Sequence, residues 1–205
     1  HGRPARRRGG GETETEEEEE EEEGVHSRGA DGKDHEETTH LLETVQRSIL
    51  ALAKRHGISQ IEMIDGNFVA IVGSDNSDAD HAAILVYFAC ECRKRVSELF
   101  KSMAAKELSI RFGIHSGNLI PEITSNDNGS CCFQLFGDTV DTAYQMLENG
   151  KANRIQVSVD TAELLNLAGK PHWISPRSDL VPVQGIGNMS TFWVKPKACL
   201  SSGKA

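Results

Sequence analysis

Residues 58–72 read ISQIEMIDGNFVAIV, and this stretch decides the fold. Two apolar, β-branched runs, Ile58 to Ile64 and Asn67 to Val72, lie on either side of Asp65-Gly66. An aspartate followed by glycine between such runs predicts a β-hairpin, because both residues tolerate the positive φ that a tight turn requires. We therefore expect two antiparallel strands joined at Asp65-Gly66.

A helix is predicted on each side of this hairpin. From Thr39 onward, apolar residues recur at helical spacing, and the basic residues 54–56 precede Gly57 as they do at many helix ends. Beyond the hairpin, Ser77 and Asp80 indicate the start of a long helix over about residues 78–104.

Strands and helices alternate along the rest of the chain. We expect strands at residues 108–115, 131–136 and 154–157, helices at residues 139–148 and 158–167, and short extended runs near Trp173, at 180–183 and at 191–194. Asp138 is predicted to cap the first of these helices, and Ser158 is predicted to open the second. This alternation is typical of an α/β (α+β) layered sandwich.

The two ends of the chain differ from this domain. Residues 1–38 are of low complexity and contain eight consecutive glutamates, Glu16 to Glu23, so we expect a disordered acidic tail. Such a tail could bind basic partners, but a solvated segment or an artefact of gene prediction is the simpler interpretation. The expected organisation is therefore a tail at 1–38, a domain at 39–195 and a flexible C-terminus at 196–205.

Charge and hydropathy exclude two classes of partner. Residues 1–40 carry a formal charge of −8 and the remainder only −1, which is not the basic surface that nucleic-acid binding needs. The longest apolar run, Ala82 to Cys90, is far shorter than the ~20 residues that span a bilayer. With no secretory leader in the sequence, we expect a cytoplasmic domain without a membrane segment, although a parent protein could be membrane-anchored.

The cysteines predict reduced thiols. There are five of them, an odd number, and Cys131 is adjacent to Cys132. This pattern argues against a disulfide framework, and the Cys90-x-Cys92 spacing is not that of a zinc site.

Five segments carry a family resemblance. They are residues 61–68 (IEMIDGNF), 111–117 (RFGIHSG), 136–143 (FGDTVDTA), 154–158 (RIQVS) and 183–193 (VQGIGNMSTFW). In the same order they resemble V-E-T-I-G-D-A-Y, R-I-G-I-H-S-G, F-G-D-T-V-N-T-A, R-I-H-V-S and V-K-G-K-G-x-M-x-T-Y-W of the class III nucleotidyl cyclase (adenylate and guanylate cyclase) catalytic domain. The resemblance covers roughly residues 39–195.

This resemblance implies a fold and a reaction. The family fold is a ferredoxin-like βαββαβ sandwich that pairs head to tail, as a homodimer or as a heterodimer with another cyclase domain. At the dimer interface the 3′-hydroxyl of GTP or ATP attacks its own α-phosphorus and expels pyrophosphate, with Mg or Mn held on paired carboxylates. The family's opening strand, similar to F-A-D-I-x-G-F, has no counterpart before Thr39. The resemblance therefore implies a sandwich that lacks its first strand and helix.

The family's metal-binding and base-reading positions are partly retained in this sequence. The family's second metal-binding aspartate lies in a Gly-Asp pair, which is reversed here, so Asp65 is either a turn residue or a displaced metal ligand. Glu62 matches the residue that reads the guanine edge, although it could equally be a solvent-facing charge. Gln134 matches a second base-reading position and could hydrogen-bond either purine. Glu62 favours guanylate over adenylate cyclase.

The ribose and phosphate positions are altered. Asp141 replaces the asparagine that orients the ribose, and Gln145 replaces the arginine that stabilises the transition state. Gln184 and Ile186 replace two phosphate-contacting lysines. His115 invites a catalytic interpretation, but packing at a strand end is the simpler one.

Three hypotheses follow for the function. The chain is a working half of a guanylate cyclase, a non-catalytic pseudo-cyclase that dimerises with and regulates a competent partner, or a truncated gene product. The altered positions favour a domain of cyclic-nucleotide signalling that is weak or inactive alone.

Overall fold

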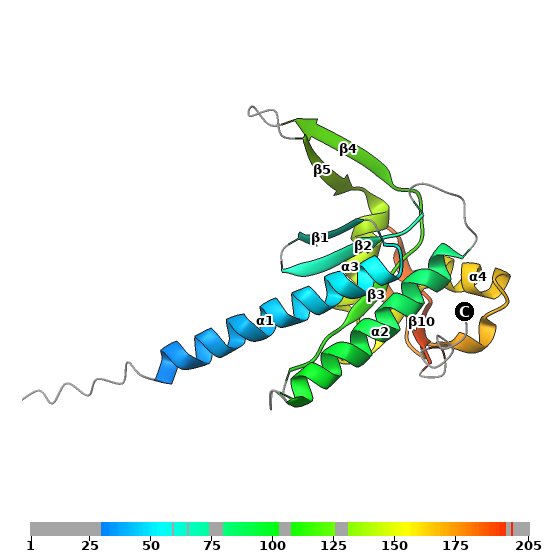
Figure 1. The fold of residues 1–205 in the computed structure, drawn as a ribbon. Coiled ribbons are helices and arrows are strands. Elements are labelled where there is room, and N and C mark those ends of the chain that lie inside the picture. The colour runs from blue at the N-terminus through cyan, green and yellow to red at the C-terminus, as the bar shows by residue number, and fades with distance from the viewer. Residues whose placement is uncertain are drawn as a thin grey trace, which may run out of the picture. The chain divides into compact units, whose positions relative to one another are not determined.

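A computed structural model describes residues 30–58, 60–64, 66–73, 80–102, 108–125, 131–195 and 198. The chain divides into two units, residues 1–37 and 38–205. Figure 1 shows the helices and strands with their labels. The helices are α1 (Ala30–Arg55), α2 (His81–Ser102), α3 (Asp138–Glu148), α4 (Val159–Leu167) and the 3-10 turn η1 (Pro171–Trp173). The strands are β1 (Gln60–Ile64), β2 (Asn67–Ile71), β3 (Phe112–Ile114), β4 (Ile120–Ser125), β5 (Cys131–Phe136), β6 (Ile155–Ser158), β7 (Ile174–Pro176), β8 (Val181–Val183), β9 (Gly187–Met189) and β10 (Thr191–Val194).

The predicted hairpin is confirmed by the pairing of its two strands. Strands β1 and β2 pair antiparallel with Ile64 opposite Asn67, and Gly66 has a φ of 77°. Alternate residues of β2, namely Phe68 and Ala70, pack against helices α1 and α2. The hairpin thus forms a small sheet of its own, held on one face by two helices.

A second sheet has four strands in the order β3-β6-β10-β7. Strand β3 is parallel to β6, whereas β10 is antiparallel to both β6 and β7. Ile155 and Val157 of β6 lie in the core cluster with residues of α2 and α4. Between them, Gln156 is fully buried and its Nε2 lies 3.8 Å from the sulfur of Met146 in α3. Helix α3 therefore covers the face opposite to α2 and α4.

Two further hairpins complete the fold. Strands β4 and β5 pair antiparallel from Ile120 opposite Phe136 to Ser125 opposite Cys131, and β8 pairs with β9. The predictions included β5 but not β4, because a proline at residue 121 and the polar residues that follow obscure a strand pattern. The mixed α+β class and the helix–strand order agree with the sequence-based expectation.

Several boundaries differ from the predictions. Helix α1 begins at Ala30, so residues 30–38 are helical although they were expected in the tail. Adding a residue to a formed helix costs little, because each adds one backbone hydrogen bond. The strand expected at 108–115 is only β3, and Ala198, in the segment expected to be flexible, is fully buried in the core. Residues 1–29 lie outside the described residues.

Two local predictions are wrong. Asp138 does not cap α3: the cap position is Gly137, with a φ of 116°, and Asp138 is the first helical residue, where its carboxylate still complements the helix dipole. Cys90 is disulfide-bonded rather than reduced. Folding can bring together cysteines whose spacing in the sequence gives no sign of pairing. By contrast, α4 begins where expected: Ser158 is its cap residue and accepts a hydrogen bond from the Thr161 amide.

Candidate functional site

Helix α3 carries the first pair of candidate residues. Asp141 and Gln145 are four residues apart and therefore share one face of the helix. Asp141 is exposed and Gln145 is partly buried, whereas Thr142 and Met146 on another face are buried. The first turn is acidic and the last turn contains no basic residue. This face of α3 therefore offers a carboxylate and an amide but no cation.

The hairpin that carries Glu62 is fastened to α3. The hydroxyl of Tyr144 donates a hydrogen bond to the carbonyl oxygen of Ile64, at 3.2 Å. Glu62 lies two residues earlier in β1, opposite Val69 of β2, and is partly exposed. The structure thus brings the strand of the candidate base-reading residue against the helix of Asp141 and Gln145.

The turn that carries Gln184 and Ile186 is held by the same helix. Val181 and Val183 of β8 and Met189 of β9 form a buried cluster with Met146 of α3. The turn between these strands is exposed, and Ile186 retains 57 % of its accessible surface. An exposed isoleucine and glutamine at this tip give no positive charge for a phosphate.

The remaining candidates are less completely described. Gln134 lies in β5, opposite Glu122 of β4, and β5 leads directly into α3, but its side chain is not among those described. Asp65 lies outside the described residues. Within the described parts of the chain, no group of three or more His, Cys, Asp or Glu side chains gathers at one place. Mg at nucleotide sites is commonly held by only one or two carboxylates together with substrate phosphates, and Asp65 is not described, so we assign no metal-dependent step to the described residues.

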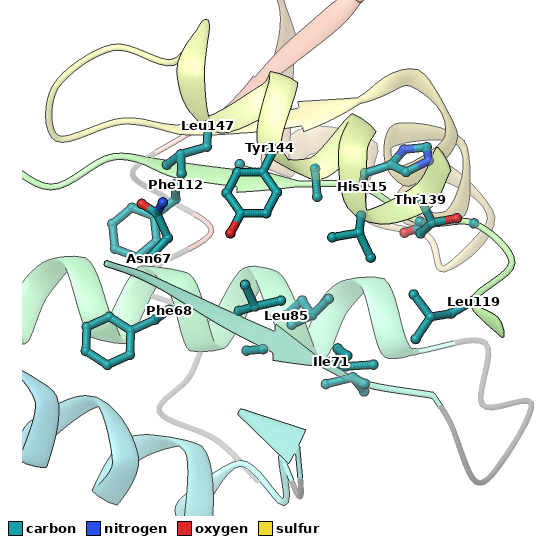
Figure 2. Close-up of a pocket in the computed structure, with 18 of the residues that line it drawn as sticks. Asn67, Phe68, Ile71, Leu85, Phe112, His115, Leu119, Thr139, Tyr144 and Leu147 are labelled. Carbon is teal, nitrogen blue, oxygen red and sulfur yellow. The ribbon is translucent and has the colours of Figure 1, made fainter. Parts of the chain in front are cut away.

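A cavity that sequence reasoning missed lies beside these residues. It has a volume of about 290 Å³ and is lined by β2, β3, and residues of α2 and α3 (Figure 2). No local pattern in the sequence signalled it, because its walls come from elements that are far apart along the chain.

His115 lies at the rim of this cavity and has a structural role. Its Nδ1 is 2.8 Å from the Ser158 hydroxyl that caps α4, and 3.6 Å from a carboxylate oxygen of Asp160. Only 10 % of the imidazole is exposed. Burial lowers the pKa of His115, and Asp160 partly opposes this effect. These contacts agree with packing at the end of a strand.

This pKa shift predicts how stability depends on pH. Because the folded state disfavours the imidazolium, the unfolded chain takes up a proton more readily as the pH falls through about 6.5. We expect the contribution of His115 to be complete above that pH and to be lost below it, with a slope of at most about 1.4 kcal/mol per pH unit. Urea denaturation between about pH 7.5 and pH 5.5 measures it. In the His115→Gln variant, the free energy of unfolding should depend less steeply on pH, because the contribution of His115 is removed. An unchanged slope contradicts the prediction.

The pH range of this denaturation experiment lies above the range in which Glu91 titrates. Burial raises the pKa of Glu91, but hydrogen bonds from His56 and Arg55 outweigh it and hold that pKa below its ordinary value. The stability that Glu91 contributes is therefore lost only below about pH 4.5, outside the proposed range.

The comparison with known families decides the identity of this fold. The family model of the adenylate and guanylate cyclase catalytic domain matches residues 28–196. The chain belongs to this family. Within it, the chain is 26 % identical over 161 residues to receptor-type guanylate cyclase gcy-13 of Caenorhabditis elegans, covering 77 % of this chain and 15 % of that protein. It is 25 % identical over 158 residues to guanylate cyclase soluble subunit beta-2 of Homo sapiens, covering 77 % of this chain and 25 % of that protein. The chain thus matches a quarter or less of the length of these relatives.

Solved cyclase structures show the same architecture. The guanylate cyclase domain of RhGC from Catenaria anguillulae, crystallised with GTP, matches with a TM-score of 0.65 at 27 % identity, covering 78 % of this chain and 84 % of that one. Adenylyl cyclase CyaB from P. aeruginosa matches with a TM-score of 0.64 at 20 % identity, covering 77 % and 81 % of the two chains, which concerns the fold alone. In the described part of this cyclase-family chain, no helix is long and apolar enough to cross a membrane.

Proposed function

We propose that this cyclase-family domain acts in cyclic-nucleotide signalling by pairing with a competent cyclase domain, and that it is weak or inactive alone. The observation that carries the proposal is that Asp141 and Gln145 lie on one face of α3; by the sequence resemblance, they match the family's asparagine and arginine. Replacing a transition-state cation by a neutral amide typically costs about a hundred- to thousand-fold in rate. The aspartate adds a negative charge close to where the triphosphate would lie.

The phosphate-contacting turn supports the same conclusion. Gln184 and Ile186 are exposed at the tip of the β8–β9 hairpin and replace both lysines. The described residues also lack a carboxylate cluster for Mg or Mn. In a mixed dimer, the partner's carboxylates would then face the altered α3 of this chain, and the partner's asparagine and arginine would face the hairpin in which the family's Gly-Asp order is reversed. Both sites of the mixed dimer are incomplete, so pairing should inhibit the partner.

A working guanylate cyclase half is the second candidate. Glu62 keeps the family's guanine-reading carboxylate on a strand fastened to α3, and the curated relatives quoted above are guanylate cyclases. If the chain binds a nucleotide, Glu62 therefore favours GTP over ATP.

One titration distinguishes these functions. The purified chain is assayed with GTP and with ATP in manganese, alone and added in excess to a competent homodimeric cyclase domain, while sedimentation reports pairing. We expect no product from the chain alone, and a fall in the partner's activity of at least about tenfold once mixed dimers dominate, because each mixed dimer loses the donors that stabilise the transition state. Heat-unfolded chain serves as the control. Product from the chain alone, mixed dimers with undiminished activity, or an absence of pairing each contradict the proposal.

A further inference from the structure

Cys90 forms a disulfide inside the core of the domain. It lies on α2 with 2 % of its surface exposed, in one cluster with Trp173 and Val194. Cys92, two residues along the same helix, is a free thiol in a different cluster, which packs against α1. Residues two apart on a helix do not face each other, so these two do not pair. The partner of Cys90 therefore comes from another part of the chain.

The segment that follows β10 enters the same cluster. Ala198 is completely buried there together with Cys90. Two backbone hydrogen bonds hold this segment: the Lys195 amide donates to the carbonyl oxygen of Trp173 at 2.7 Å, and the Ala198 amide donates to that of Lys195 at 3.0 Å. The chain thus turns from the end of β10 back onto the face of the sheet that α2 and α4 cover.

Chain connectivity brings Cys199 within reach of Cys90. Cys199 lies outside the described residues, but it follows Ala198 directly, and consecutive Cα atoms are about 3.8 Å apart. The Cα atoms of disulfide-bonded residues are usually about 4.4 to 6.8 Å apart. A residue next to a core neighbour of Cys90 can therefore make the bond.

The other two cysteines are less suitably placed. Cys131 and Cys132 begin β5, opposite Ser125 and Thr124 of β4. Strand β5 leads into α3, which covers the sheet face opposite to α2. Figure 1 shows the β4–β5 hairpin projecting away from α2. The cysteine that remains in the sequence is Cys199.

From these contacts we propose that Cys90 is bonded to Cys199, and that the bond tethers the segment after β10 to helix α2. It closes a loop of about 110 residues, which restricts the unfolded chain far more than the folded one. The bond forms by thiol–disulfide exchange, in which a disulfide oxidant takes two electrons and two protons from the two cysteines and leaves as two thiols. Cys92 does not compete, because burial, together with the charge of Glu91, raises its pKa to about 12 and keeps it from forming the nucleophilic thiolate.

The tether makes the stability of the domain depend on the oxidation state of two thiols. It lies on the side of the sheet that α2 and α4 cover, whereas the candidate site is organised by α3 on the other side. The inference therefore does not depend on the inhibitory role proposed above.

Peptide mapping identifies the partner of Cys90. The full chain, purified without reductant, is unfolded in urea with N-ethylmaleimide to block free thiols and is then cut with trypsin. Cleavage after lysine and arginine places Cys90 and Cys92 on residues 56–93, Cys131 and Cys132 on residues 112–151, and Cys199 on residues 198–204. We expect 56–93, carrying one maleimide, joined to 198–204 by a bond that dithiothreitol breaks. A link from 56–93 to 112–151, a covalent dimer on a non-reducing gel, or no linked peptide overturns the proposal.

Urea denaturation tests whether the bond acts as a tether. Without reductant, Cys199→Ser should lower the midpoint by at least about 1 M urea, and dithiothreitol should lower the midpoint of the wild-type chain to the same value. Dithiothreitol should then have no further effect on Cys199→Ser. Cys131→Ser is the matched control, since it removes another cysteine and should keep the wild-type response to dithiothreitol. A response that persists in Cys199→Ser, or one that disappears in Cys131→Ser, overturns the tether, as do equal midpoints for Cys199→Ser and the wild-type chain.

Discussion

Replacing Gly113 with alanine is expected to lower the free energy of unfolding by at least about 3 kcal/mol, although it adds a single methyl group. Gly113 lies in the middle of β3, under α3. A Cβ at this position would lie 2.6 Å from the carbonyl oxygen of Ala143 and 2.8 Å from the carbonyl carbon of Met146. Both are backbone atoms, so no side chain can rotate to relieve the clash. Either α3 or β3 must move, and a movement of α3 disrupts the contacts that Met146 and Tyr144 make with the two hairpins.

Urea denaturation of the wild-type chain and of Gly113→Ala measures this effect. Gly185→Ala is the matched control, since Gly185 has a φ of 80° and open space around its Cβ position. It should cost only about 1 kcal/mol, through backbone strain alone. Equal costs for the two variants would show that α3 does not approach β3 as closely as the structure indicates.

Local signals in the sequence predicted the parts of the fold that short-range chemistry controls. The hairpin formed by β1 and β2, and the beginning of a helix at Ser158, depend on one or two residues and their immediate neighbours, and both are confirmed. Gly113 could be recognised only as a glycine within a strand pattern. Its reason, the close approach of a helix that begins 25 residues later, is a tertiary contact that no local pattern reveals. The Cys90 disulfide is hidden from the sequence in the same way.

The candidate site shows the same division. The spacing of Asp141 and Gln145 predicted one helix face, and the structure places them on α3 as expected. That the same helix also holds the hairpin of Glu62, through Tyr144, and the turn of Gln184, through Met146, follows only from the assembled fold. Likewise, the cavity between β2 and β3 is lined by residues that are far apart in the sequence, and it is visible only in the assembled fold.

Because one helix organises these positions, restoring α3 should restore a site. We expect the double variant Asp141→Asn with Gln145→Arg to raise cyclase activity by about a hundred-fold or more in a mixed dimer with a partner that keeps its metal-binding carboxylates but lacks its own asparagine and arginine. The substitution removes a negative charge near the triphosphate and returns a cation four residues away on the same helix face. Both side chains lie away from the buried Thr142 and Met146, so the fold should tolerate the change. Production of cyclic nucleotide by the mixture measures it.

Control variants show whether the position of the substitution on α3 matters, or only the change in net charge. Asp138→Asn removes the same charge from the exposed first turn of α3 but lies outside the Asp141–Gln145 pair, and it should leave the mixture inactive. Adding lysines at Gln184 and Ile186 to the double variant should raise the rate further, because these exposed positions would then contact phosphate oxygens. If the wild-type chain supports the crippled partner as well as the double variant does, then Asp141 and Gln145 are not what limits this domain. The proposal of an inhibitory partner would then fail, because its mixed dimers already contain a complete site.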